Sequence, residues 1–171
     1  GHSAETITWT SDRSGIASSG EWRIAKIPQA QATATPRSVR PGARAQAAQV
    51  EVQPRPEDRR VDVLVDGKPF TSYAWPERVS KPILYPIRTA RGTIVTRGFP
   101  LDTRPGERVD HVHQAGYWFT YGDVDGVDFW GNSEAIPPAE RAKMGVIRHR
   151  EVVAASGGAG GGDLEIRADA L

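Results

Sequence analysis

The chain of 171 residues contains no cysteine. This absence excludes disulfides, thiolate metal sites and cysteine nucleophiles. No apolar run approaches the roughly 20 residues that a membrane helix needs, so we expect no membrane span. The 22 basic and 21 acidic side chains leave a formal net charge of only +1. A charge this small gives no general attraction to nucleic acid or to an anionic membrane, and either would require a local basic patch.

Aromatic residues are missing between Trp22 and Phe70, and five prolines fall between Pro28 and Pro56. Such a stretch has little to bury against its ordering entropy, which predicts a loop or a mobile arm. The arm carries arginines without interleaved stacking aromatics, so we expect a solvated segment and no nucleic-acid partner. These arginines are Arg37, Arg40 and Arg44.

A signal peptide is not evident at the start of the chain, where Gly1-His2-Ser3 resembles the remnant of a cleaved expression tag. Since a leader can be removed before this point, cytoplasmic and periplasmic or secreted locations stay equally open.

Helical periodicity is nearly absent, and short alternating runs punctuated by Gly, Pro and Asp predict an all-β fold, an antiparallel β-sandwich. Residues 1–56 are expected to hold a hairpin followed by the arm, and residues 57–171 the sandwich domain. A short helix is expected over Pro137–Met144. The predicted strands are 6–9, 21–27, 61–65, 68–75, 83–87, 93–97, 117–121, 127–130, 146–153 and 164–168.

The last predicted strand begins just after the glycine-rich loop of residues 156–162, and the sequence ends a few residues later, at Leu171. A strand at the end of a sheet leaves an unpaired edge. We therefore expect an incomplete half of a larger sandwich, completed either by a missing C-terminal half or by self-association.

Two histidines, His111 and His113, lie in the richest stretch of polar and aromatic residues, from Asp110 to Trp130. An extended backbone would place both imidazoles on one face. Neighbouring imidazoles can share proton transfer or bind a metal, and they can equally make ordinary hydrogen bonds to the backbone. If the fold adds His149, three imidazoles would form a site for a divalent metal; otherwise no cofactor is required.

Further candidates for ligand contacts surround the histidines. Asp123 and Asp128 fit hydrogen bonding to sugar hydroxyls or orientation of a histidine, whereas their spacing does not fit a calcium loop. Arg97 fits a cation that holds an oxyanion, or a surface ion pair. Three aromatics form either a stacking platform for a sugar or part of the core: Trp118, Tyr121 and Trp130.

Several separated motifs resemble the bacterial family labelled methane oxygenase PmoA, over roughly residues 60–153. The motifs are Lys81-Pro-Ile-Leu-Tyr-Pro-Ile-Arg-Thr89, Gly92-Thr-Ile-Val-Thr-Arg97, Asp110-His-Val-His113, Trp118-Phe119 and Gly122-Asp-Val-Asp-Gly-Val-Asp-Phe-Trp130. This resemblance implies a soluble sandwich related to galactose-mutarotase-like proteins, unrelated to the membrane methane monooxygenase. It also implies a carbohydrate-related role with His111 and His113 at the site.

Three functions are compatible with these residues. In the first, His111 and His113, helped by Asp123, perform acid-base chemistry on a sugar ring in a cleft that also contains Arg97 and Asp128. In the second, the chain is a non-catalytic carbohydrate-binding or assembly module. In the third, the histidines hold a metal for a metal-dependent enzyme. Motifs of nucleotide-binding, kinase, α/β-hydrolase and zincin enzymes are absent from the sequence.

Overall fold

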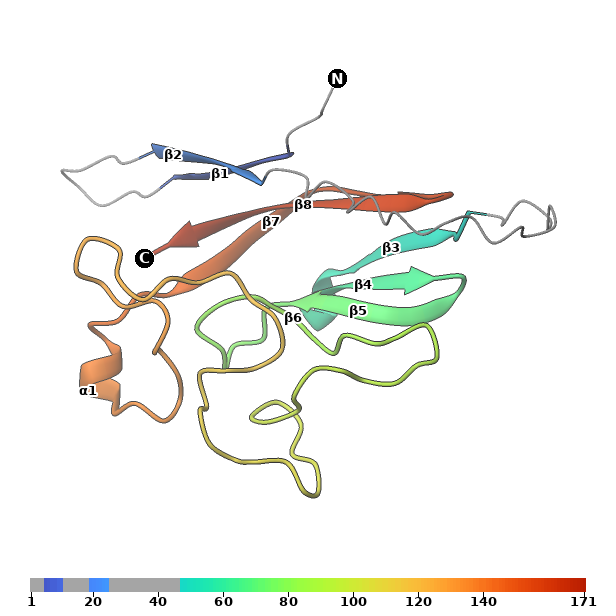
Figure 1. Ribbon diagram of the computed structural model, residues 1–171. Helices are drawn as coiled ribbons and strands as arrows, with labels where there is room; N and C mark the ends of the chain where they lie inside the picture. The colour runs from blue at the N-terminus through green and yellow to red at the C-terminus, as the bar shows by residue number, and fades with distance from the viewer. Residues whose placement is uncertain (1–4, 11–18, 25–46) are drawn as a thin grey trace, which may run out of the picture.

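A computed structural model describes residues 5–10, 19–24 and 47–171 of the chain (Figure 1). Within these residues the regular structure is nearly all β, with one short α-helix and one short 3-10 helix, which confirms the predicted fold class. The helices are α1 (Pro138–Arg141) and η1 (Pro56–Asp58). The strands are β1 (Glu5–Thr10), β2 (Ser19–Ile24), β3 (Val50–Arg55), β4 (Arg60–Val65), β5 (Lys68–Ala74), β6 (Ile83–Leu84), β7 (Ile147–Gly158) and β8 (Gly161–Ala170). The structure contains no described helix with the length and apolar character of a membrane span.

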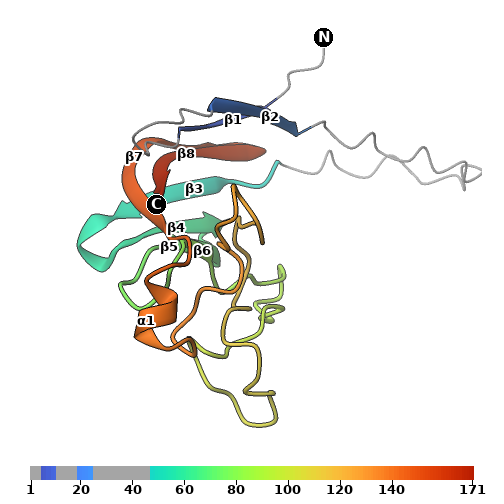
Figure 2. The same cartoon turned by 90° about the vertical axis from the view of Figure 1, so that its left-hand side faces the viewer.

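The strands form three antiparallel sheets that do not close into a barrel: β1-β2, β3-β4-β5-β6 and β7-β8. The β1-β2 pair has the strands of the predicted N-terminal hairpin. The long β7-β8 hairpin lies over β3, and β1 lies next to β8, so the sheets stack in layers (Figure 2). Residues 85–146 form a large region that consists of loops and α1, and this region lies on one side of the layers (Figure 1).

Strand β3 corrects the prediction that residues 28–56 form a loop or arm. Residues 25–46 lie outside the described residues, but Val50–Arg55 pair with β4 in regular antiparallel register. Val50 and Val52 alternate with the polar Glu51 and Gln53, which is the period of a half-buried strand. The loop prediction gave weight to the lack of aromatic residues in this stretch. Two valines bury little apolar area by themselves, so their short alternation was a weak signal for a strand.

A close backbone crossing joins β3 to the end of the β7-β8 hairpin. A Cβ atom added to Gly157 would lie 2.3 Å from the Val50 carbonyl oxygen, so only glycine allows this approach. On β8, a Cβ on Gly162 would lie 2.8 Å from Cγ1 of Val50. The glycine-rich segment predicted as a hairpin loop therefore extends the hairpin and lets a second strand pass directly against it.

The loop region contains three predicted strands that do not form, at residues 93–97, 117–121 and 127–130. Each segment makes only an isolated bridge: Ile94 with Arg88, Tyr117 with Leu84, and Val127 with Val124. Glycine, proline and aspartate interrupt the sequence on both sides of these segments, so they cannot extend into ladders.

The described core is small, and a buried lysine ties the loop region to it. The fully or nearly buried apolar residues are Val61, Tyr73, Ile83, Ala115 and Phe129. The Lys81 side chain is only 1% exposed. Its ammonium donates hydrogen bonds of 2.7 Å to the carbonyl oxygens of Phe129 and Trp130, so one cation holds the far end of the loop region against β6.

Candidate functional site

The two histidines singled out from the sequence lie at a turn, not on an extended strand. The Gln114 amide donates to the His111 carbonyl at 2.8 Å, and His111 has a positive φ of 50°. The condition of an extended backbone, under which the sequence would place both imidazoles on one face, is therefore not met. The turn still brings the two imidazoles together, with ring centroids 5.8 Å apart.

His111 is oriented by a carboxylate that the sequence reading did not include in the site. Its Nδ1 lies 3.1 Å from Oδ2 of Asp110. Arg97 holds Asp110 in turn, because its guanidinium donates to the Asp110 carbonyl and lies 3.2 Å from Oδ1. Arg97 is thus occupied by protein partners and positions the carboxylate, instead of offering a free cation to a ligand. Arg97 and Asp110 are 13 residues apart in the sequence, so no local pattern indicated this contact.

His113 lies beside Trp130, with ring centroids 6.2 Å apart. The Trp130 side chain is 44% exposed, so its ring is accessible to a ligand. Partial burial lowers the pKa of His113, and the neighbouring charges of His111 and Lys81 lower it further, so this imidazole is neutral at pH 7. We refer to Arg97, Asp110, His111, His113 and Trp130 as the histidine cluster.

Trp118 does not belong to an exposed platform. Its half-buried ring lies 4.4 Å from the Lys81 ammonium, in cation-π geometry. The residues alternating with it are instead the exposed ones: Tyr117, Phe119 and Tyr121, at 65%, 68% and 66% exposure. In an extended segment, residues 117, 119 and 121 lie on one face and residues 118 and 120 on the other. Applied to the sequence, this rule would already have placed Trp118 and Tyr121 on opposite faces.

The side chains of the two predicted aspartates, Asp123 and Asp128, accept hydrogen bonds from backbone amides of the loops. Oδ1 of Asp123 accepts from the Gly126 amide at 2.7 Å, which closes the turn that follows it. Oδ1 of Asp128 accepts from the Trp130 and Gly131 amides at 2.7 and 3.0 Å. Asp128 is also close enough to raise the pKa of His113, whereas Asp123 is an exposed turn residue.

His149 lies elsewhere, on β7. Its ring stacks on Trp75 at a centroid distance of 3.7 Å and an interplanar angle of 25°. Its Nδ1 is hydrogen-bonded to the Tyr73 hydroxyl at 3.2 Å. The structure does not bring the three histidines into one site, and among residues 5–10, 19–24 and 47–171 no three potential metal-ligating side chains gather around one point.

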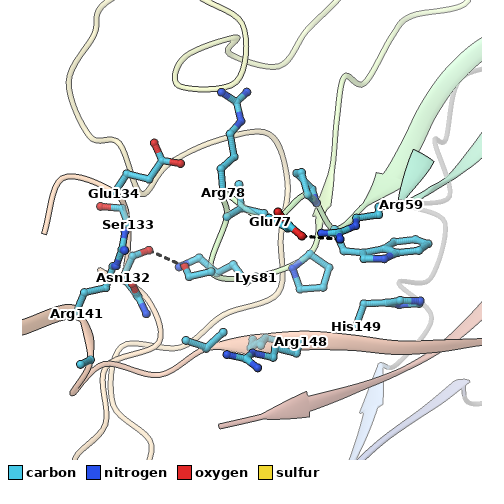
Figure 3. Close-up of a pocket in the computed structure, with 18 of the residues that line it drawn as sticks. Arg59, Glu77, Arg78, Lys81, Asn132, Ser133, Glu134, Arg141, Arg148 and His149 are labelled. Atoms are coloured by element: carbon cyan, nitrogen blue, oxygen red, sulfur yellow. Dashed lines mark hydrogen bonds and ion pairs between the residues drawn. The ribbon is translucent and has the colours of Figure 1, made fainter. Parts of the chain in front are cut away.

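The stacked pair of Trp75 and His149 lies at a cavity of about 910 Å³ between β7, α1 and the loops that follow β5 (Figure 3). Five basic and two acidic residues line it: Arg59, Arg78, Lys81, Arg141, Arg148, Glu77 and Glu134. No sequence motif pointed to this cavity, because its walls come mainly from two segments separated by about 50 residues of chain. The histidine cluster and this cavity are separate places in the part of the chain that the structure describes.

Acid conditions are expected to destabilise the fold through His113 and His149. Burial lowers the pKa of both imidazoles below the ordinary 6.5. As the pH falls below 6.5, the unfolded chain binds protons first, so the free energy of unfolding decreases until the pH passes the folded pKa values. Urea denaturation of wild type and His149→Gln between pH 7.5 and 5 measures this slope, which should be shallower in the variant. An unchanged slope would contradict the assignment for His149.

Comparison with known proteins finds one family match. The model of a family described as "Family of unknown function (DUF6807)" matches residues 60–169. This range begins with β4 and includes both the histidine cluster and most of the cavity walls. No curated protein and no solved structure matches the chain.

Proposed function

Because the chain belongs to the DUF6807 family, whose function is unknown, we propose from its geometry that it binds a carbohydrate at the histidine cluster. The observation that carries the proposal is an exposed indole, Trp130, beside two imidazoles, one of them oriented by a carboxylate. The sequence resemblance to the family labelled PmoA supports the same class of ligand.

The chemistry of a pyranose fits these groups. Its C–H face is apolar and packs on an aromatic ring, whereas its hydroxyls require hydrogen-bond donors and acceptors at the ring edge. Trp130 supplies the ring. The neutral His113 and the Asp110-oriented His111 supply donors and acceptors at neighbouring positions.

The separation of the histidines favours binding over mutarotase-like chemistry with these two groups as acid and base. A sugar ring between two groups needs a contact of about 3.5–4 Å on each side, roughly 7–8 Å in all. Imidazole centroids 5.8 Å apart leave too little room for this. Both histidines therefore approach a sugar from one side in this arrangement.

Loss of the indole is expected to weaken sugar binding. Saturation-transfer difference NMR with lactose, cellobiose and maltose should detect binding at about millimolar dissociation constants, weakened about tenfold by Trp130→Ala. Phe70→Ala is the matched control, since Phe70 is a partly exposed aromatic on β5, far from the cluster in sequence. The proposal is wrong if no disaccharide binds, or if Trp130→Ala binds as tightly as wild type.

Acid-base catalysis is the second candidate, because the Asp110–His111 contact is the arrangement of an oriented general base. Polarimetry on freshly dissolved α-D-glucose and α-D-galactose decides between the two. Faster mutarotation that is lost in both His111→Gln and Asp110→Asn supports catalysis. Sugar binding without any rate enhancement supports the binding module.

A further inference from the structure

The cavity beside β7 is a second candidate binding site, and its argument does not depend on the histidine cluster. Its volume of about 910 Å³ is at the upper end of the range of ligand pockets, roughly 300–1,000 Å³. In Figure 3, Arg148 and His149 on β7 face the segment that carries Glu77 and Arg78 across this space. A ligand in the cavity would thus contact a sheet strand on one side and loops on the other.

The side chains that line the cavity carry a net positive charge. Four arginines and Lys81 against two glutamates leave a formal excess of three positive charges, and Lys81 is already held by the carbonyls of Phe129 and Trp130. Arg59 and Glu77 form an ion pair of 2.6 Å, and the Arg78 guanidinium donates to the Leu101 carbonyl at 2.7 Å.

Arg141 and Arg148 are the cations that remain for a ligand. Within the part of the chain that the structure describes, neither of them makes an ion pair, and Glu134 is the one lining carboxylate outside the Arg59 pair. Both guanidinium groups are exposed to solvent at the cavity wall, so their attraction for an anion is sensitive to salt. The walls therefore favour an anion, and guanidinium groups bind carboxylate and phosphate oxygens in a bidentate manner.

Two further features indicate that the ligand also has a ring and hydroxyl groups. The stacked pair of Trp75 and His149 gives the cavity a flat wall. Burial lowers the pKa of His149, so the imidazole stays neutral and does not add to the positive charge. Asn132 lines the cavity with a side chain only 1% exposed. Its Nδ2 donates to the Gly145 carbonyl, while its Oδ1 has no hydrogen-bond partner among the described residues and can accept from a hydroxyl.

We propose that this cavity binds a small acidic carbohydrate, a single hydroxylated ring that carries a carboxylate or a phosphate. The anionic group pairs with Arg141 and Arg148. The ring packs near Trp75 and His149, where its hydroxyls find polar partners. Carboxylate and phosphate present the same oxygen geometry to a guanidinium, so the experiment separates the two.

Isothermal titration calorimetry with D-galacturonate, glucose 6-phosphate and inorganic phosphate tests the site, with uncharged D-galactose as the matched neutral probe. We expect saturable binding of at least one acidic sugar, with D-galactose weaker by about tenfold or more. Raising the salt concentration from about 50 to about 200 mM should weaken the binding, because the contacts are electrostatic. Preference for galacturonate or for glucose 6-phosphate identifies the anionic group.

Arg148→Gln is expected to weaken the binding about tenfold, and the double variant Arg141→Gln/Arg148→Gln further. Arg91→Gln is the matched control, since Arg91 is exposed in a turn outside the cavity and its loss changes the net charge equally. Both cavity arginines are exposed, so we expect the variants to fold, and circular dichroism checks this.

The proposal is overturned if neither acidic sugar binds, if D-galactose binds as tightly as its acid, or if the double variant retains wild-type affinity. Binding of inorganic phosphate without either sugar also overturns it, because the ring would then have no part in recognition. Failure of the disaccharides at the histidine cluster would leave this result unaffected, so the two sites can fail separately.

Discussion

Replacement of Lys81 by methionine is expected to lower the free energy of unfolding by about 2–4 kcal/mol, a large share of the 5–15 kcal/mol typical of a domain. Methionine nearly preserves the volume of the side chain but removes both hydrogen bonds to the carbonyls of Phe129 and Trp130. Burial of the ammonium, which lowers the pKa of Lys81 to about 8, is a cost that the variant no longer has. This relief offsets part of the loss, so the expected value is below the sum of two charged hydrogen bonds.

The two carbonyl oxygens differ in the hydrogen-bond donors that remain to them in the Lys81→Met variant. The Phe129 oxygen also accepts from the Thr120 hydroxyl at 2.8 Å, whereas Lys81 is the side-chain donor to Trp130. Urea denaturation of Lys81→Met measures the effect, and Lys68→Met, at an exposed position at the start of β5, is the control, with an expected change within about 0.5 kcal/mol. A wild-type value for Lys81→Met would show that the loop does not depend on the ammonium.

Substitution of Gly157 by alanine is expected to cost about 2–4 kcal/mol of stability, since a new methyl group must displace packed backbone. The added Cβ would lie 2.3 Å from the Val50 carbonyl oxygen and 3.0 Å from the Cα of Glu51. Because both atoms belong to the backbone of β3, no rotation of a side chain can relieve the clash. Either β3 or the hairpin has to shift.

The neighbouring glycine provides the matched control. A Cβ on Gly158 would have no atom within 4 Å, and its backbone is not in the left-handed region. Gly158→Ala should therefore be neutral or slightly stabilising, by up to about 1 kcal/mol. Thermal and urea unfolding of both variants measure the contrast. Equal stability of the two variants would contradict the close crossing of β3 and β7.

The sequence predicted the elements that depend on local signals. Asp66 and Gly67 have φ values of 50° and 69°, as a two-residue hairpin turn requires, and β4 and β5 pair around them as expected. The β7-β8 hairpin was also predicted, although its strands run further toward the turn. In both cases, alternating apolar residues and glycine determine the structure within about 20 residues.

The site was harder to predict because its contacts are not local. The proximity of His111 and His113 was correct, but through a turn, which an alternation of two does not reveal. The burial of Lys81 depends on carbonyls 48 and 49 residues away. Nothing in its neighbours distinguishes it from an exposed lysine. The position of His149 depends likewise on Tyr73 and Trp75, which come from β5 in another sheet and from the residue after it.

The hydrogen bonds of Lys81 join residues 48 and 49 positions apart, and this separation affects the order in which parts of the molecule unfold. Closing a chain segment of this length costs entropy that its few short-range contacts, such as Arg97 with Asp110, offset only in part, so the segment should become ordered late in folding. Partial unfolding would release residues 85–130 together while the strand ladders persist. The histidine cluster would then be lost in one step, whereas the β7 wall of the cavity would survive it. A ligand at the cluster would consequently also protect the whole of this late-ordering segment against amide hydrogen exchange.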